Sequence, residues 1–343
     1  MRTRRILVVG ATGFVGLHVV DALLAAGYRV RATRRPRSVT LLLRRRNVEL
    51  VAASLEDGEA LQKAMADCDA VCFCAAHYPR YSTNPEAAIC VAGDGTRTIV
   101  DAALAAGVPR LVVTGSIASL GPAPAGRWAD ERDVFDAPPR GSVYAEVKWQ
   151  VERELAAGRA RGLSIVSLLA GACIGADDLR LGTNGVLAAM LAGALPWWVD
   201  GRVNVVDVRD VARAHVAALA QESPLPYYAL PGRTVRTCAL FQWLARRYGV
   251  AAPALELSAE EAARRADDDE RAAEPNRGRV FWPRELVDLV VHGQRVSDAA
   301  ARRDLAFERT PIGETFDQAA AWIATHVLAP ARRREERRAH EHE

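Results

Sequence analysis

The sequence contains almost no lysine. Of the 45 basic residues in this 343-residue chain, only Lys63 and Lys148 are lysines, and the rest are arginines. Arginine keeps its proton in proteins and presents a broad planar fork, whereas lysine is a compact ammonium group on a flexible stem. A position that needs a small cationic donor would retain lysine, so the neighbours of these two residues are informative.

Other absences exclude whole classes of protein. The six cysteines form no Cys-x-x-Cys pair and no metal-ligand spacing with histidine, so we expect reduced thiols and no metal site. The net charge is only +3 and the basic residues are scattered among acids, which argues against nucleic-acid binding. No apolar run approaches the roughly 18 residues that a membrane span requires. Glycines interrupt the apolar segment after the basic residues 1–5, which argues against a secretion signal, and we expect a cytoplasmic protein.

Short apolar segments alternate with helical patterns through the first half of the chain. We predict strands at residues 5–10, 28–33, 48–52, 70–75, 110–114 and 163–169, with an edge piece at 203–206 and a helix at 211–220. Strands that alternate with helices are typical of a parallel sheet covered on both faces. The sequence therefore predicts an α/β fold with a doubly wound, Rossmann-type sheet.

The pattern changes after about residue 232 to helices and irregular segments. We assign residues 1–174 and about 203–230 to the Rossmann domain, and residues 175–202 and 231–330 to a smaller C-terminal substrate-binding domain. Residues 331–343 are almost all Arg, Glu and His, without an apolar face, so we expect a charged tail.

A glycine-rich segment joins the first strand to the first helix. It runs Gly10-Ala-Thr-Gly-Phe-Val-Gly16, and glycines there allow a tight turn and close approach of the backbone to a pyrophosphate. The start of the following helix offers backbone N–H groups to the anion. We predict that a dinucleotide contacts Gly10, Thr12, Gly13, Phe14, Val15 and Gly16.

The residues after the second strand indicate which dinucleotide is bound. An acidic residue there accepts hydrogen bonds from the adenosine ribose, whereas arginine pairs with a 2′-phosphate. This chain has Thr33-Arg34-Arg35 and no acid, which favours NADP(H) over NAD(H), although arginine is abundant throughout. Further candidate cofactor contacts follow the later strands: Ser54, Leu55, Ala75, Ala76, Thr114, Gly171 and Cys173.

One of the two lysines lies four residues after a tyrosine. In Tyr144-Ala-Glu-Val-Lys148 the two side chains share one face of a predicted helix, and an ammonium beside a phenol favours the phenolate that a general acid/base needs. Ser116, just past the fifth strand, is the candidate to polarise a substrate oxygen. A Tyr-x-x-x-Lys spacing also arises by chance in amphipathic helices, but its place after a Ser-bearing strand end favours catalysis.

The substrate pocket should lie above the carboxyl ends of the strands. Aromatic side chains with polar tips suit a sugar face or a flat ketone, so we consider His77, Tyr78, Tyr81, Trp197 and Trp198 as substrate contacts. Packing between the two domains is an equally good interpretation of the two tryptophans. Asp207 and Asp210 fit a strand end and a helix cap better than catalysis.

These segments together resemble a known family. The chain is similar to the NAD-dependent epimerase/dehydratase branch of the extended short-chain dehydrogenases, and within it to dihydroflavonol-4-reductase-like and hopanoid-associated sugar epimerase proteins. The resemblance implies a nicotinamide cofactor, a variable substrate domain, and a homodimer formed on the helices around 94–106 and 144–157. The matching segments are Gly10–Gly16, Ala75-Ala76, Val112–Gly121, Tyr144–Lys148 and Asn204–Ala212 for the family, and Ala75–Tyr78, Asn84–Glu86 and Leu195–Asp200 for the subgroups.

The chain also departs from the family pattern. Ala92 replaces a usual asparagine, Leu169-Ala170 replaces an Asn/Arg-Pro pair, and Ser54 replaces an aspartate. These changes alter the surroundings of the cofactor but leave Ser116, Tyr144 and Lys148 in place. Three functions therefore stay open: a carbonyl reductase or alcohol dehydrogenase that uses NADP(H), which we prefer, a sugar epimerase that recycles its own cofactor, and a nucleotide-sensing protein without turnover.

Overall fold

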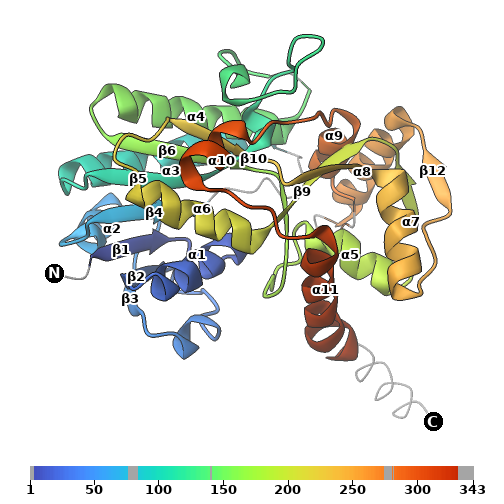
Figure 1. The fold of residues 1–343 in the computed structure, drawn as a ribbon, viewed down its shortest axis with the longest axis horizontal. Helices are drawn as coiled ribbons and strands as arrows, with labels where there is room; N and C mark the ends of the chain where they lie inside the picture. Colours follow the sequence, from blue (N-terminus) through green and yellow to red (C-terminus); the bar gives the residue numbers. More distant parts are fainter. Residues whose placement is uncertain (1–3, 76–83, 140, 274–279, 281, 331–343) are drawn as a thin grey trace.

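A seven-stranded parallel sheet forms one half of the molecule in this computed structural model (Figure 1). The structure describes residues 4–75, 84–139, 141–273, 280 and 282–330. The strand order is β3-β2-β1-β4-β5-β6-β10, and every neighbouring pair is parallel, as the alternating pattern predicts. The strands are β1 (Arg5–Val9), β2 (Arg29–Arg34), β3 (Glu49–Ala52), β4 (Ala70–Phe73), β5 (Arg110–Ser116), β6 (Ser164–Ala170) and β10 (Tyr227–Leu230).

Helices cover both faces of this sheet, and each face has its own apolar core. The helices α1 (Phe14–Ala25) and α6 (Val208–Ala220) pack on one face, and α2 (Gly58–Met65), α3 (Pro85–Ala105) and α4 (Val143–Ala160) pack on the other. Strands buried on both faces are continuously apolar, which explains runs such as Ile6-Leu-Val-Val9. Among the described residues, no helix is both long and apolar enough to cross a lipid bilayer.

The edge of the sheet differs from the expectation. We predicted residues 203–206 as an edge piece, but β9 (Arg202–Asp207) is the central strand of a separate three-stranded sheet, between β11 (Arg233–Arg236) and β7 (Ala172–Ile174). The edge position belongs to β10, which pairs with β6. This strand has only four residues and follows Pro226, so its pattern was too short to identify from the sequence.

The second half of the molecule lies beyond the carboxyl ends of the strands, on the right of Figure 1. Its own apolar core combines residues from β7 to α11, including Phe241, Trp282 and Phe316. Its further elements are α5 (Asn184–Leu191), β8 (Trp197–Val199), α7 (Thr237–Tyr248), β12 (Leu255–Leu257), α8 (Ala259–Ala273), α9 (Arg284–Val291) and α11 (Ile312–Ile323).

One late segment returns to the first half. The helix α10 (Ala299–Leu305) packs against β10 and α6, and Ala301, Leu305 and Phe307 belong to the same core as β1 and α1 (Figure 1). Our division assigned all of residues 231–330 to the substrate half, and α10 departs from it. Because this helix follows the others without a change in composition, only the fold reveals which core it joins.

Candidate active site

The glycine turn between β1 and α1 is shaped so that only glycine fits at two positions. Gly10 has φ = +89°, and a Cβ atom on it would lie 2.4 Å from the backbone nitrogen of Ala75. A Cβ atom on Gly16 would lie 2.2 Å from the carbonyl oxygen of Gly10. The turn therefore brings the N-terminus of α1 directly against the end of β4. Thr12, Gly13, Phe14 and Val15 lie in this turn or the first residues of α1, as predicted.

Two arginines lie at the end of β2. Arg34 is the last residue of that strand and Arg35 comes next, while the hydroxyl of Thr33 accepts a hydrogen bond of 3.4 Å from the backbone of Gly10. Within the described part of the chain, no acidic side chain pairs with either guanidinium group. Both arginines thus directly follow Thr33, which is bonded to the glycine turn.

The residues after β3 are only partly exposed. The hydroxyl of Ser54 accepts a bond of 3.4 Å from the backbone of Glu56, and a Cβ atom on Gly95 of α3 would lie 3.3 Å from the Leu55 side chain. Leu55 thus packs against α3 as well as bordering the predicted adenine position. Ala75 meets Gly10, as described above, whereas Ala76 lies outside the described residues.

Ser116, Tyr144 and Lys148 come together where β5 ends and α4 begins. Ser116 is the last residue of β5 and caps the short 3₁₀ helix η2 (Ile117–Ser119), because its Oγ accepts a bond of 3.2 Å from the backbone of Ala118. Tyr144 lies in the first turn of α4, and the Lys148 Nζ stands 5.3 Å from the centre of its ring. Lys148 is only 8% exposed, so its ammonium is held beside the phenol rather than in solvent. By contrast, Lys63 of α2 is 74% exposed and pairs with Glu59.

A buried carboxylate lies on α4 one helical turn after Lys148, and no pattern in the sequence singles it out. Glu152 is one helical turn after Lys148 and 4% exposed, and it accepts a hydrogen bond of 2.8 Å from the Ser167 hydroxyl. A Cβ atom on Gly115 would lie 3.1 Å from its Oε1, so the carboxylate touches the strand directly before Ser116. Burial raises the pKa of Glu152, while the charges of Arg159 and Lys148 and the Ser167 bond oppose that shift.

Thr114 bonds to α6, which packs on the same face of the sheet as α1. Its hydroxyl and the Nε2 of His215 in α6 are 2.9 Å apart, and the Nδ1 of His215 is 2.9 Å from the carbonyl oxygen of Val211. A carbonyl only accepts, so Nδ1 carries the proton and Nε2 accepts from Thr114. His215 is completely buried, and desolvation lowers its pKa to about 4. This threonine therefore anchors α6 to β5, and its cofactor contact stays a prediction.

A cavity of about 150 Å³ opens beside Ser116 and Tyr144. Gly171, a predicted cofactor contact, lines it on the side of the sheet. Cys173, a second predicted contact, packs into the core with α1, and its thiol donates to the Gly171 carbonyl at 3.6 Å. Most of the wall comes from the second half of the molecule. It consists of apolar side chains on α5, α7, α9 and α11.

The two predicted tryptophans lie behind this wall rather than in it. Trp197 is 3% exposed and stacks on Trp282, with ring centres 5.7 Å apart, and Trp198 meets the edge of Phe241. Trp282 and Phe241 line the cavity, whereas neither Trp197 nor Trp198 is among its described lining residues. The packing interpretation of this pair fits the geometry better than substrate contact. The candidates His77, Tyr78 and Tyr81 lie outside the described residues.

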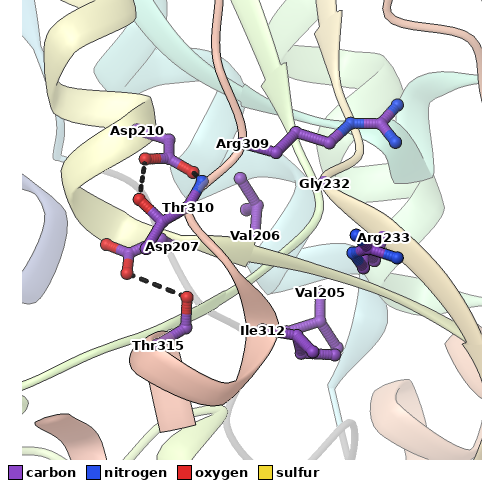
Figure 2. Close-up of a pocket in the computed structure, with 10 residues that line it drawn as sticks. All are labelled: Val205, Val206, Asp207, Asp210, Gly232, Arg233, Arg309, Thr310, Ile312 and Thr315. Carbon is purple, nitrogen blue, oxygen red and sulfur yellow. Dashed lines mark hydrogen bonds between the residues drawn. The ribbon is translucent and has the colours of Figure 1, made fainter.

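Asp207 and Asp210 fasten the C-terminal segment to α6, as their predicted structural role requires. Asp207 caps α6 by accepting from the backbone of Arg209 at 2.8 Å and also accepts from the Thr315 hydroxyl at 2.9 Å. Asp210 accepts from the backbone and hydroxyl of Thr310 at 2.8 and 2.6 Å (Figure 2). The crevice between these residues measures about 10 Å³, room for about one water molecule.

Comparison with known proteins identifies the family of this chain. The model of the NAD dependent epimerase/dehydratase family matches residues 6–228. The chain belongs to this family. Its members pair a nicotinamide dinucleotide with oxidoreductase or epimerase chemistry, and we conclude that this protein is such an enzyme.

Individual relatives carry both kinds of name. A putative dihydroflavonol 4-reductase of Synechocystis is 34% identical over 212 residues, which cover 62% of each chain. The sterol demethylase protein B of Methylococcus capsulatus is 28% identical over 321 residues, 92% of this chain and 97% of that protein. The crystal structure of a nucleoside-diphosphate-sugar epimerase from Pseudomonas aeruginosa is 25% identical, covers 95% of this chain and 99% of that one, and superposes with a TM-score of 0.77.

Proposed function

We propose that this member of the family is an NADP(H)-dependent oxidoreductase that reduces a ketone of a small molecule, or oxidises the corresponding secondary alcohol. The observation that carries the proposal is that Ser116 and Tyr144 border one cavity while Lys148 lies against the Tyr144 ring. A hydroxyl donor, a phenol and an ammonium at one place form the set that carbonyl reduction needs.

Each of the three side chains has a distinct task in this mechanism. The Ser116 hydroxyl donates to the substrate oxygen and polarises the carbonyl. The Tyr144 phenol gives its proton to that oxygen as the carbonyl carbon is reduced, and the Lys148 ammonium stabilises the resulting phenolate. The bound nicotinamide supplies the hydride. In the oxidation direction the same phenolate removes the alcohol proton.

The preference for NADP(H) rests on the end of β2. Arg34 and Arg35 present two guanidinium groups without acidic partners in the described structure, beside a turn that suits a pyrophosphate. A 2′-phosphate pairs with such groups, whereas the ribose hydroxyls of NAD(H) offer no charge to compensate them. We place the pyrophosphate at residues 10–16 and the adenine near Ser54 and Leu55.

We also propose a homodimer and a cytoplasmic location. The helices α3 and α4 pack against each other and expose Val91 at 53%, which supports a contact between two copies on this side. All six cysteines are free thiols, which fits a reducing compartment. Size-exclusion chromatography with light scattering tests the dimer directly.

The enzyme assay must separate reduction from epimerisation, because a structural relative is a sugar epimerase. The purified protein is incubated with NADPH and a panel of ketones, and separately with nucleotide-sugars, while absorbance at the nicotinamide band and the products are followed. A reductase consumes NADPH in proportion to alcohol formed. An epimerase converts its sugar without net cofactor change. A sensor binds the nucleotide tightly and does neither.

A further inference from the structure

The cavity beside Ser116 and Tyr144 is lined mostly by apolar side chains. Apart from Tyr144, none of the described residues that line it has an ionisable side chain. The far wall is formed by Leu240, Phe241, Leu244, Trp282, Leu286 and Phe316. A charged ligand group would lose its hydration here without gaining an opposite charge.

Two polar side chains of the wall, Asn204 and Thr237, are occupied by bonds within the protein, whereas Thr183 makes no side-chain bond to the helix α5 that follows it. Asn204 donates to the carbonyl of Gln294 at 2.9 Å and accepts from the Thr234 hydroxyl at 2.5 Å. Thr237 donates to the carbonyl of Val199 at 2.8 Å and accepts from the backbone of Gly201 at 3.1 Å. The hydroxyls of a sugar would therefore find few partners along this wall.

Polar groups for a ligand are concentrated at the reactive end. Ser116 and Tyr144 are there, next to Gly171 between β6 and β7, while the opposite end is formed by α7, α9 and α11. A ligand that fits both ends has one oxygen at one end and an apolar body at the other. A nucleoside diphosphate does not match, because its two phosphates need cationic partners that this wall lacks among its described residues.

We propose that the substrate is an uncharged molecule with an apolar, ring-sized carbon skeleton and a single ketone or secondary hydroxyl, and that nucleotide-sugars are excluded. This inference rests on the proposed function for the position of the reacting oxygen. The apolar wall selects the body of the substrate by burying it, and Ser116 and Tyr144 select the oxygen. Selection by hydrocarbon surface predicts a graded dependence on substrate size.

The test measures binding without turnover. The protein is saturated with NADP⁺, or with NAD⁺ if it prefers that cofactor, and titrated calorimetrically with cyclohexanone and its 4-methyl, 4-ethyl and 4-propyl derivatives. An oxidised cofactor and a ketone cannot react, so affinity is read independently of catalysis. We expect binding to tighten about fourfold for each methylene that enters the cavity. The 4-carboxylate should bind at least about 100-fold more weakly than the 4-methyl compound.

A pair of variants at Leu240 tests whether the apolar wall causes this dependence on substrate size and charge. This half-buried residue of α7 lines the cavity and stands apart from Ser116 and Tyr144. Leu240→Arg should abolish binding of the 4-alkyl cyclohexanones and improve binding of the 4-carboxylate. The volume-conserving Leu240→Met should retain the gain in affinity with each added methylene. Thermal melting and NADP⁺ affinity verify that both variants fold.

The possible outcomes separate the two proposals. If the alkyl series binds as expected but no ketone oxidises NADPH, the cavity assignment stands and the reductase proposal fails. If affinity is flat across the series, or if UDP-glucose binds more tightly than the alkyl ketones, the apolar-substrate inference is overturned.

Discussion

The two sides of the active site are built from different materials. On the side where we propose that the cofactor binds, the backbone makes the surface, and Gly10 and Gly16 are required because any Cβ atom would collide with neighbouring main chain. On the substrate side apolar side chains from four helices make the surface, and few of their polar neighbours are available. A backbone surface tolerates no alternative residue, whereas an apolar wall can be rebuilt with many. This difference explains how one fold keeps its cofactor while its substrates change.

Tyr144 stands where the two sides meet, so its replacement should have the largest effect. Tyr144→Phe removes the proton donor while keeping the ring against Lys148, and we expect kcat to fall about 10²- to 10⁴-fold. The affinity for NADP(H) should stay within about twofold, because the phenol acts on the substrate. Steady-state kinetics with a substrate found in the ketone panel and fluorescence titration of NADPH measure the two quantities.

Tyr28→Phe is a matched control, since Tyr28 precedes β2 at the end of the strand opposite Arg34. It should leave kcat unchanged. An unchanged rate in the Tyr144 variant would remove the acid/base assignment and favour a binding protein.

The cofactor half also contains a buried histidine, which should make it sensitive to acid. Because the folded state holds the His215 pKa at about 4, below the unfolded value of 6.5, the unfolded chain binds a proton first as pH falls. The stability that the neutral ring provides is complete above pH 6.5 and is lost as pH falls towards 4, a change of about 3 kcal/mol in the free energy of unfolding.

Urea unfolding at several pH values measures this loss, with His215→Gln as the reference. The stability difference between the two proteins should shrink as the pH falls from 7 to 4. Parallel curves would show that the histidine does not control acid stability.

Gly16 tests whether the backbone surface is as intolerant as the geometry indicates. Gly16→Ala places a methyl group 2.2 Å from the carbonyl oxygen of Gly10, so the turn must move. We expect NADPH to bind about 10- to 100-fold more weakly, the range that corresponds to overpacking by about 1–3 kcal/mol. In contrast, Gly185→Ala in α5 meets no atom within 4 Å and should leave cofactor affinity unchanged. Equal affinities in the two variants would contradict the account of the turn.

The smallest expected effect concerns the choice of cofactor. Replacing the half-buried Arg34 and the exposed Arg35 with alanine should lower the preference for NADPH over NADH about tenfold, because solvent weakens part of their attraction for phosphate. Arg37→Ala, just beyond the strand, should change the ratio little. The dissociation constants of the two cofactors give the preference, and an unchanged ratio in the double variant would refute the phosphate site.

The sequence predicts the side of the glycine turn better than it predicts the apolar substrate side. The glycine turn, six of the seven strands and the Tyr144–Lys148 pair were predicted because each imposes a spacing that few other structures share. The sequence does not indicate the four-residue β10, nor that α10 joins the core of the first half, because neither element has a distinctive pattern.

The substrate wall could not be predicted for a related reason. Phe241 and Trp282 look like ordinary core residues, since a helix presents the same apolar stripe to a cavity as to a packed interior. The sequence suggests Trp197 as a substrate contact because its ring has a polar tip, but the fold buries it behind Trp282. The sequence does not indicate Glu152, because a glutamate in a helix is usually exposed, and only the fold places it against Gly115, the residue before Ser116.

The scarcity of lysine has a practical consequence for handling the protein. Reagents directed at primary amines will find one accessible side chain, Lys63 on α2, since Lys148 is enclosed. Apart from the amino terminus, a dye or a solid support attached through such chemistry will therefore sit at a single known point outside the cavity wall. Under more forcing conditions the same reagents would also modify Lys148. The rate of that slower modification, with and without a ligand, would measure how well the ligand shields the Lys148 amine.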